Sequence, residues 1–383
     1  MTLPQTADVV IIGGGVMGTS TAYHLARRGV QRVVLLERDS FFGSGATGRC
    51  AGGIRHQFST AVNIRLSLHS LRMLEAFEEE LGQAIDLKRC GYLFLLSTPE
   101  EMEQFRRSVA LQNSLGVTSR LVDVGEIAAR VPLLNLQGIV GGAFYEKDGT
   151  ADPSSVVQGY VKGARRLGAT LLTDVEVTGI TVNGGRVVGV QTTEGPISTP
   201  VAVNAAGPWA GLVGRMAGVE LPITPERQQI VVTAALPELP PDFPFVIDFH
   251  QRLYFHREGE GLLTGQSMVG RTPTFDQSVD PSWTVHHLGN AIERLPLLEH
   301  AGLLTEWAGL YENTPDAHPI IGPAGVEGFY VVAGFSGHGF MHGPVAGLLV
   351  AEQIVDGQAH TVDIHALRYE RFAEGAPPEF NVV

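Results

Sequence analysis

Residues 8–40 read DVVIIGGGVMGTSTAYHLARRGVQRVVLLERDS, and this stretch decides the fold. The short β-branched run Val9–Ile12 ends at glycines, as is typical of a buried parallel strand. A helix is expected after it, and a second apolar run, Val33–Leu36, ends at the acid Glu37. This order of strand, glycine turn, helix, strand and acid predicts a dinucleotide-binding unit.

Each part of the unit has a mechanical reason. Gly13 permits the tight turn, and Gly15 lets the backbone approach a pyrophosphate at the positive end of the helix. Gly18 allows the helix and strand to pack closely, while Glu37 can accept hydrogen bonds from both ribose hydroxyls of an adenosine. The alternative for Glu37 is an ordinary surface acid.

The composition describes a large protein without obvious targeting signals. The chain has 383 residues, of which 44% are hydrophobic, which is enough for two domains. No apolar window reaches the length of a membrane span, and no secretory signal is visible at the N-terminus. Because only two cysteines are present, Cys50 and Cys90, a disulfide framework is not expected. We therefore predict a cytoplasmic protein.

The charge balance excludes one class of partner. The net charge of -13 argues against nucleic acid, because binding to its phosphates requires a basic surface. The same charge is compatible with an anionic cofactor, whose phosphates backbone N–H groups can hold. No His/Cys/Asp spacing resembles a metal site, so no metal is expected.

The strand, glycine turn and helix pattern returns twice. Val201–Val203 runs into a turn of small residues at 204–209, and Gly328–Ala333 runs into a glycine turn followed by an expected helix over Gly343–Val355. Asp152 and Pro153 are typical of a helix start, and the turn at 183–185 predicts a hairpin.

Segments of sheet character separate these units. The fold class expected is α/β: a discontinuous Rossmann-like nucleotide-binding domain with an inserted, mostly antiparallel substrate domain. The expected nucleotide-binding parts are 1–85, 148–220 and 309–383, and the substrate parts are 86–147 and 221–308.

Five motifs together carry a family resemblance. In chain order they are Gly13–Gly18 with Glu37, Arg49–Arg55, Asn204–Trp209, Trp307–Asp316 and Gly334–Phe340. With these motifs, nearly the whole chain resembles the FAD-dependent amine oxidoreductases of the D-amino-acid oxidase and sarcosine oxidase superfamily. Within it, the chain is most similar to the catalytic β subunits of L-proline dehydrogenases and then of heterotetrameric sarcosine oxidases.

The resemblance implies noncovalent FAD, with ADP on the first glycine turn and Glu37, and adenine against the backbone of Val177. It places the flavin ring under Arg49, Gly52 and the turn Gly337–Phe340. The cofactor-binding residues that it implies are Gly13, Gly15, Val16, Met17, Gly18, Glu37, Arg38, Ser44, Thr47, Arg49, Cys50, Ala51, Gly52, Gly53, Val177, Ala205, Gly207, Trp209, Gly309, Gly334, Gly337, His338, Gly339, Phe340 and Met341.

The substrate residues implied by the resemblance are Arg55, His338, Tyr254 and Tyr311. Arg55 matches an arginine that grips a substrate carboxylate, which suits the planar guanidinium fork. Each has a structural alternative: a surface ion pair for Arg55, a loop hydrogen bond for His338 and ordinary packing for the two tyrosines.

Four departures from the family pattern refine these expectations. Gly309 stands where monomeric sarcosine oxidases attach FAD to a cysteine, and Leu263 stands where they carry a lysine that promotes reaction with oxygen. Met341 replaces their second carboxylate-binding lysine, and Pro153 stands where heterotetrameric β subunits carry a histidine that tethers a second flavin. The pattern favours a dehydrogenase with noncovalent flavin.

The function expected is oxidation of the C–N bond of a small amino or imino acid, proline or sarcosine-like, by hydride transfer to flavin. One alternative is a free-standing oxidase that produces hydrogen peroxide. Another is a flavin-bearing assembly or partner subunit without turnover. The expected partners are the substrate and either an α subunit or another electron acceptor.

Overall fold

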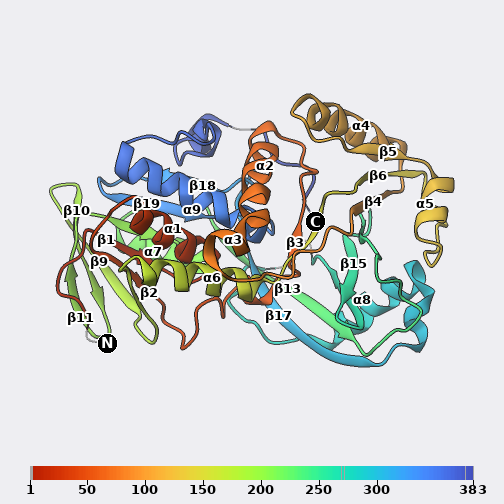
Figure 1. Cartoon of the computed structure of the whole chain (residues 1–383), viewed down its shortest axis with the longest axis horizontal. Coiled ribbons are helices and arrows are strands. Elements are labelled where there is room, and N and C mark those ends of the chain that lie inside the picture. The colour runs from red at the N-terminus through yellow and green to blue at the C-terminus, as the bar shows by residue number, and fades with distance from the viewer. Residues whose placement is uncertain (1–2, 269, 271, 376, 383) are drawn as a thin grey trace.

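A six-stranded sheet organises one end of the molecule (Figure 1). The computed structural model describes residues 3–268, 270, 272–375 and 377–382. The strands lie in the order β18 (Ile320–Pro323), β19 (Phe329–Ala333), β12 (Ala202–Asn204), β1 (Val9–Ile12), β2 (Val33–Leu36) and β8 (Thr170–Leu172). Only the pairing of β18 with β19 is antiparallel. The three strands that lead into glycine or small-residue turns, β19, β12 and β1, are therefore adjacent and parallel.

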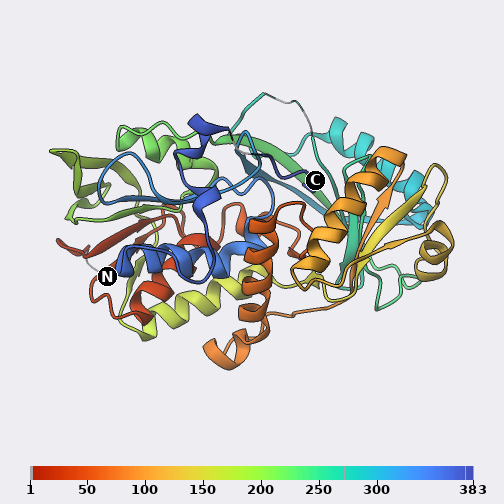
Figure 2. The ribbon, with the colours of Figure 1, turned by 90° about the horizontal axis from the view of Figure 1, so that it is seen from above.

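The two faces of this sheet bury different cores. Val9 and Ile11 of β1 face a helical layer, whereas Val10 and Ile12 face the opposite side, because successive strand residues alternate. Figure 2 shows the helical layer, which contains α1 (Val16–Arg27), α6 (Pro153–Arg166) and α9 (Gly339–Asp356). The other face carries α7 (Ala210–Met216) and a three-stranded antiparallel sheet of β9 (Val177–Asn183), β10 (Arg186–Thr192) and β11 (Gly195–Ser198). β1 and β2 consist only of aliphatic residues because both faces of the sheet are covered.

Helices α1 and α9 approach each other through glycines of α9. A Cβ at Gly343 would lie 2.5 Å from Val16 Cγ2, and a Cβ at Gly347 would lie 2.3 Å from Ser20 Oγ. The Ser20 hydroxyl donates to the carbonyl of Pro344, 3.0 Å away. The close approach fixes the N-terminal ends of the two helices relative to one another.

An eight-stranded sheet forms the other end of the molecule (Figure 1). Its order is β17 (Leu303–Asn313), β13 (Thr224–Thr233), β16 (Gly261–Gln266), β15 (Leu253–Glu258), β14 (Phe245–Asp248), β4 (Tyr92–Leu96), β6 (Gly141–Tyr145) and β5 (Arg120–Val122). Every pair is antiparallel except β14 with β4. The helices of this part are α4 (Pro99–Ser114), α5 (Val124–Arg130) and α8 (Pro281–Arg294). Between the two ends stand α2 (Ala61–Glu75), α3 (Phe77–Leu81) and the short pair β3 (Gly53–Ile54) and β7 (Gly149–Thr150).

The expected α/β fold with a mostly antiparallel second sheet is confirmed, and so are two local predictions. Asp152 caps α6 by accepting from the N–H groups of Ser154 and Ser155, and Gly184 and Gly185 form the two-residue turn between β9 and β10. The domain boundaries themselves stay a prediction. Among the described residues, no helix combines the length and the apolar character that a membrane span requires.

The predicted start of one helix was wrong. The helix that follows β19, α9, begins at Gly339, four residues before the predicted start at Gly343, so Phe340 and Met341 belong to its first turn. Pro344 lies inside the helix, where it removes a backbone donor. The buried contacts of α9 with α1 hold the helix together across this position.

We predict that Gly347→Ala destabilises the protein. The added Cβ would meet Ser20 Oγ at 2.3 Å and the Thr21 nitrogen at 2.5 Å, so the helices must separate. The expected loss in free energy of unfolding is about 1–3 kcal/mol, measured by thermal or denaturant unfolding. Gly289→Ala is the control, because it lies in the exposed part of α8 with no atom within 4 Å of its Cβ. Equal stability of the two variants would contradict the prediction.

Candidate active site

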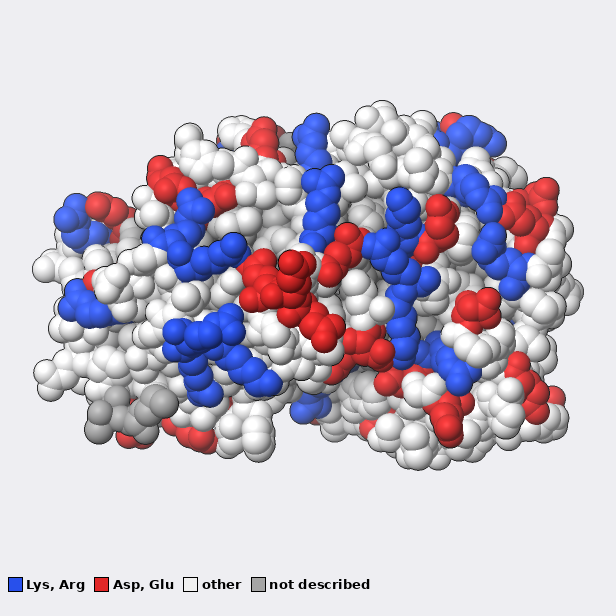
Figure 3. Space-filling model, viewed as in Figure 1, with Lys and Arg blue, Asp and Glu red and all other residues white. Residues whose placement is uncertain are grey.

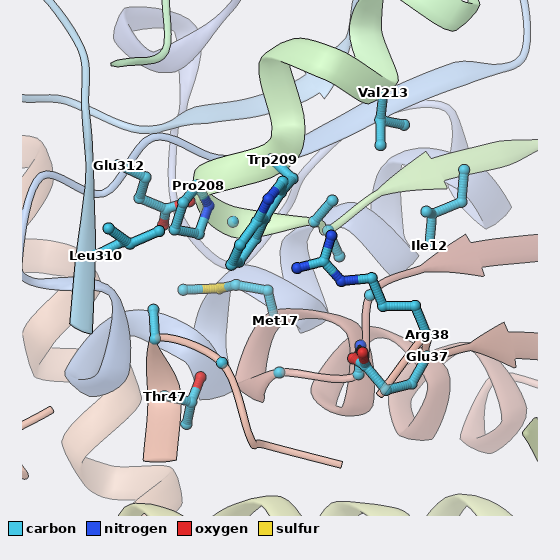
Figure 4. A pocket seen from close by; sticks show the side chains of 18 of the residues that line it. Ile12, Met17, Glu37, Arg38, Thr47, Pro208, Trp209, Val213, Leu310 and Glu312 are labelled. Carbon is cyan, nitrogen blue, oxygen red and sulfur yellow. Dashed lines mark hydrogen bonds between the residues drawn. The ribbon is translucent and has the colours of Figure 1, made fainter. Parts of the chain in front are cut away.

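A long channel runs past the carboxyl ends of β1, β2 and β12 (Figure 4). It is lined by the first glycine turn, the acid after β2, the turn after β12, the end of β17 and the start of α9. The lining includes Gly13, Gly15, Val16, Met17, Glu37, Arg38, Thr47, Cys50, Val177, Ala205, Gly207, Trp209, Tyr311, Glu312, Gly337, Gly339 and Phe340. Side chains that lie far apart in the sequence therefore share one elongated cavity.

The glycine turn leaves the start of α1 open to the channel. Gly13 has a φ of 110°, and a Cβ there would lie 2.4 Å from the Ala205 carbonyl oxygen. Gly18 packs so closely that a Cβ would lie 1.9 Å from the Gly13 carbonyl oxygen. The N-cap residue, Gly15, has no side chain to cover the helix start, and the N–H of Val16 donates to the Thr47 hydroxyl at 3.2 Å. The positive end of α1 can therefore receive an anion.

The carboxylate of Glu37 is held in a fixed orientation. The N–H groups of Gly14 and Asp39 donate to Oε2 and Oε1 at 2.7 and 2.9 Å. Burial raises the pKa of Glu37, and the two N–H bonds oppose that shift. Each oxygen keeps a lone pair for a further donor. Because Glu37 is half-buried and lines the channel, its geometry favours the ribose-binding role over that of a surface acid.

The end of the channel near Arg38 and Trp209 has an aromatic wall. The Arg38 guanidinium lies 4.0 Å from the centroid of the Trp209 ring. Figure 4 shows the two side chains next to each other. The other neighbour of Trp209 is Phe275, whose ring stacks on it at 5.7 Å. The three side chains come from separate parts of the chain: the turn after β2, the turn after β12 and the loop before α8.

A second pocket adjoins the channel near the start of α9. The two cavities share Ala46, Cys50, Leu310, Tyr311, Gly337 and Phe340. The second pocket is further lined by Arg49, Ala51, Gly52, Gly53, Arg55, Tyr92, Gln228, Ile230, Phe245, Ile247, Tyr254, Gly309, Ser336, His338, Met341 and Val382. It combines one buried cation with a largely aromatic wall.

Arg55 is the buried cation. It is 5% exposed, and its Nη1 and Nη2 donate to the carbonyls of Gln57 and Asn381 at 2.9 and 2.6 Å. Its guanidinium lies 4.0 Å from the centroid of the Phe58 ring, and burial lowers its pKa. Within the described ranges no carboxylate forms an ion pair with Arg55. The surface ion pair that was the alternative for this residue is therefore wrong.

The aromatic wall consists of neutral groups. Tyr92 stacks on Phe245 at 4.2 Å, and Phe245 stacks on Tyr254 at 5.8 Å. Burial raises the pKa of Tyr254 well above its ordinary value and that of Tyr311 to about 12. Both phenols therefore stay protonated at neutral pH and line the pocket, while Tyr254 also packs in the apolar cluster below it.

His338 lies in a chain of hydrogen bonds. Its Nε2 is 3.0 Å from the carbonyl oxygen of Ala317, which only accepts, so we assign the proton to Nε2. Its Nδ1 then accepts from Nδ1–H of His342 at 3.2 Å, and His342 Nε2 accepts from the Ser67 hydroxyl at 2.8 Å. Burial lowers the pKa of His338 to about 4. The ring is neutral and both its nitrogens are occupied.

The four residues that depart from the family pattern lie in different parts of the structure. Leu263 is buried in the apolar cluster that contains Tyr254, and Met341 lines the second pocket. A Cβ at Gly309 would lie 3.0 Å from Arg49 Cβ, so the backbone of β17 lies close to that arginine. Pro153 is the first residue of α6.

Three predicted cofactor residues line neither cavity: Ser44, Gly18 and Gly334. Ser44 donates to Asp39 instead, Gly18 packs beneath the glycine turn, and Gly334 has a φ of 87° and lies beside Thr314.

Sequence reasoning also missed Glu312 and the segment 377–382. Glu312 belongs to the motif Trp307–Asp316, but what distinguishes it from other acidic residues is its burial, which the sequence does not show. In the part of the chain that the structure describes, no group of three or more His, Cys, Asp or Glu residues could hold a metal ion.

Comparison with known proteins identifies the class. The chain belongs to the FAD dependent oxidoreductase family, whose model matches residues 8–353. A crystal structure of L-proline dehydrogenase from P. horikoshii is similar at 34% identity, with a TM-score of 0.91, and the match covers 98% of this chain and 100% of that one.

Curated relatives have similar sequence identities to this chain. Human mitochondrial sarcosine dehydrogenase is 34% identical over 97% of this chain but only 42% of its own length. Sarcosine oxidase subunit beta of Rhodobacter capsulatus is 30% identical over 96% of this chain and 89% of its own length. The chain thus spans less than half the length of the mitochondrial relative.

FAD is therefore the cofactor, and the channel fits it. The glycine-lined start of α1, the oriented carboxylate of Glu37 and the glycine turn before α9 are suited to phosphates and a nucleoside. Glu312 Oε2 is buried against the channel and has no hydrogen-bond partner among the described residues. A polar ligand in the channel would supply one.

We predict that Glu37→Gln weakens FAD binding by about 10-fold to 100-fold. The substitution removes the negative charge. It also replaces one accepting oxygen with an amide NH2, which cannot accept the hydrogen bond from the backbone N–H, at a cost of about 1–3 kcal/mol. The FAD dissociation constant, followed by flavin fluorescence, measures the effect. Glu194→Gln, an exposed residue of a surface turn, is the control. Unchanged affinity in Glu37→Gln would refute the assignment of the adenosine end.

Proposed function

We propose that this chain oxidises the C–N bond of a small amino or imino acid. Proline is the first candidate substrate, and sarcosine or another N-alkyl glycine is the second. The observation that carries the proposal is the buried guanidinium of Arg55, which borders the second pocket without a carboxylate partner among the described residues. A buried cation favours an anionic ligand, because an unpaired charge in a dry site is costly.

The walls of the pocket prepare the substrate. FAD, when bound, supplies the hydride acceptor. Arg55 holds the carboxylate, and the aromatic residues Tyr92, Phe245 and Tyr254 exclude water from the carbon that is oxidised. Low polarity and the nearby guanidinium both disfavour an ammonium ion, so the pocket favours the neutral amine that can donate hydride.

The comparisons support this substrate class. The names of the relatives include proline and sarcosine dehydrogenases, and a glycine oxidase from Geobacillus kaustophilus is 27% identical with a TM-score of 0.85. We favour a dehydrogenase because Leu263 replaces the oxygen-activating lysine with an apolar group. The oxidase remains the second candidate, favoured by the likeness to glycine oxidase.

We further propose that FAD is held noncovalently and that the electrons leave through an α subunit or a separate acceptor. Gly309 offers no side chain for attachment, and the Rhodobacter capsulatus relative is by name one subunit of its enzyme. Cys50 and Cys90 are free thiols, which supports the proposal of a cytoplasmic, reducing location.

We predict that Arg55→Ala raises the substrate KM by about 100-fold, because one partner of a buried charge pair is lost at a cost of about 2–5 kcal/mol. Arg55→Lys should recover part of the affinity, since it keeps the charge without the fork. The measurements are anaerobic flavin bleaching by proline and by sarcosine, together with the dissociation constant of a non-oxidisable carboxylate. Flavin content verifies folding. Unchanged affinity in Arg55→Ala would favour the subunit without turnover.

We predict that hydrogen peroxide forms at a rate at least about tenfold below that of flavin reduction by substrate. The reason is that no cation at position 263 stabilises the charge that develops on oxygen. Stopped-flow reduction and a peroxide assay in air give the two rates on the same preparation. Equal rates would establish the oxidase and reject the dehydrogenase.

A further inference from the structure

Glu312 is a buried acid that the proposed reaction does not use. It lies on β17, is 9% exposed, and borders the channel beside Gly207. A Cβ built on Gly207 would lie 3.5 Å from Glu312 Oε2. Figure 4 shows Glu312 on the same side of the channel as Pro208 and Leu310.

The two carboxyl oxygens of Glu312 have different surroundings. Oε1 accepts from the N–H of Phe335 at 3.3 Å, whereas Oε2 has no partner in the described part of the chain. When the group is a neutral acid, the proton therefore belongs on Oε2, because Oε1 already acts as an acceptor. The resulting O–H is a donor that borders the channel.

We propose that Glu312 is a cofactor-binding residue that acts as a neutral carboxylic acid, donating Oε2–H to an oxygen of the diphosphate and ribityl part of FAD. Two observations support the neutral form. The cofactor is an anion, and a carboxylate beside it would add like charge in a dry site. Burial raises the pKa of Glu312 to about 7, although the N–H groups of Gly334 and Phe335 oppose the shift.

Two titratable neighbours of Glu312 do not change charge between pH 6 and 9. Its strand neighbour Tyr311 has a pKa raised to about 12, and His338 on the adjoining turn has a pKa lowered to about 4, in both cases by burial. On β13, Pro225 pairs with Glu312, and the neighbouring Glu226 accepts from Asn313.

Among the groups that line the channel, Cys50 and Glu37 also have shifted pKa values. Burial raises the pKa of the Cys50 thiol to about 12, so it does not ionise in this range. Burial also raises the pKa of Glu37 from its ordinary value of 4.5, and deprotonation of a ribose acceptor strengthens binding as pH rises. The effect of Glu37 therefore has the opposite sign to that proposed for Glu312.

The proposal predicts that FAD affinity falls with rising pH. The protonated acid binds FAD better, so bound FAD raises the pKa of Glu312 further, and affinity is highest below its pKa in the free protein. Between pH 6 and 9 the dissociation constant of the wild type should rise at least about tenfold, which corresponds to one unit of pKa change. Release of FAD from the diluted holoprotein, followed by flavin fluorescence, provides the measurement without turnover.

Three variants separate the role of Glu312 from other effects. Glu312→Gln keeps a donor but cannot ionise, so its affinity should match the wild type at pH 6 and stay flat to pH 9. Glu312→Ala lacks the donor and should bind about tenfold more weakly at pH 6, also without pH dependence. Glu306→Gln, on the same strand but outside both cavities, should follow the wild type.

Two results would overturn the proposal. The first is a Glu312→Gln curve with the slope of the wild type, which would assign the pH dependence elsewhere. The second is a wild-type affinity that is flat or rises with pH, which would make Glu312 a bystander or an anionic acceptor. The proposal rests on FAD as cofactor and not on the proposed substrate, so an inactive protein that binds FAD still tests it.

Discussion

The adjacency of three parallel strands is the constraint on which the site depends. β19, β12 and β1 are hydrogen-bonded neighbours, although they come from opposite ends of the chain. Since parallel strands end at the same sheet edge, the turns that follow them meet there. The glycines of α9 then let it approach α1 until their backbones nearly touch, which fixes the direction of two helix starts. The channel is a consequence of that packing.

This arrangement explains how a chain with a net charge of -13 accommodates an anionic cofactor. Positive potential comes from backbone N–H groups at helix starts and not from a basic surface. Figure 3 shows acidic and basic side chains interspersed over one face. Inside, burial raises the pKa of Glu312 to about 7, and the neutral form that we propose for this group adds no negative charge beside the phosphates.

The sequence predicted the parts of the structure that local patterns govern. The β1, α1 and β2 unit, the cap at Asp152 and the hairpin turn at 184–185 each follow from neighbouring residues. The early start of α9 was missed because Pro344 argues locally against it, whereas packing against α1 decides the outcome. Likewise, the contact of Arg55 with Asn381 joins positions 326 residues apart, and no periodic pattern in the sequence can predict such a contact. The resemblance indicated part of the lining of both cavities, but not that a backbone carbonyl holds Arg55.

The segment 377–382 near the C-terminus contributes to the electrostatics of the site. Glu379 is buried and accepts from the N–H and hydroxyl groups of Ser59 and Thr60, just before α2, which anchors the segment. Two residues later, Asn381 offers Arg55 a carbonyl, and Val382 lines the second pocket. A neutral carbonyl partially satisfies the guanidinium without cancelling its charge. The cation can therefore be buried before substrate arrives and still attract a carboxylate, which a salt bridge at the same position would prevent.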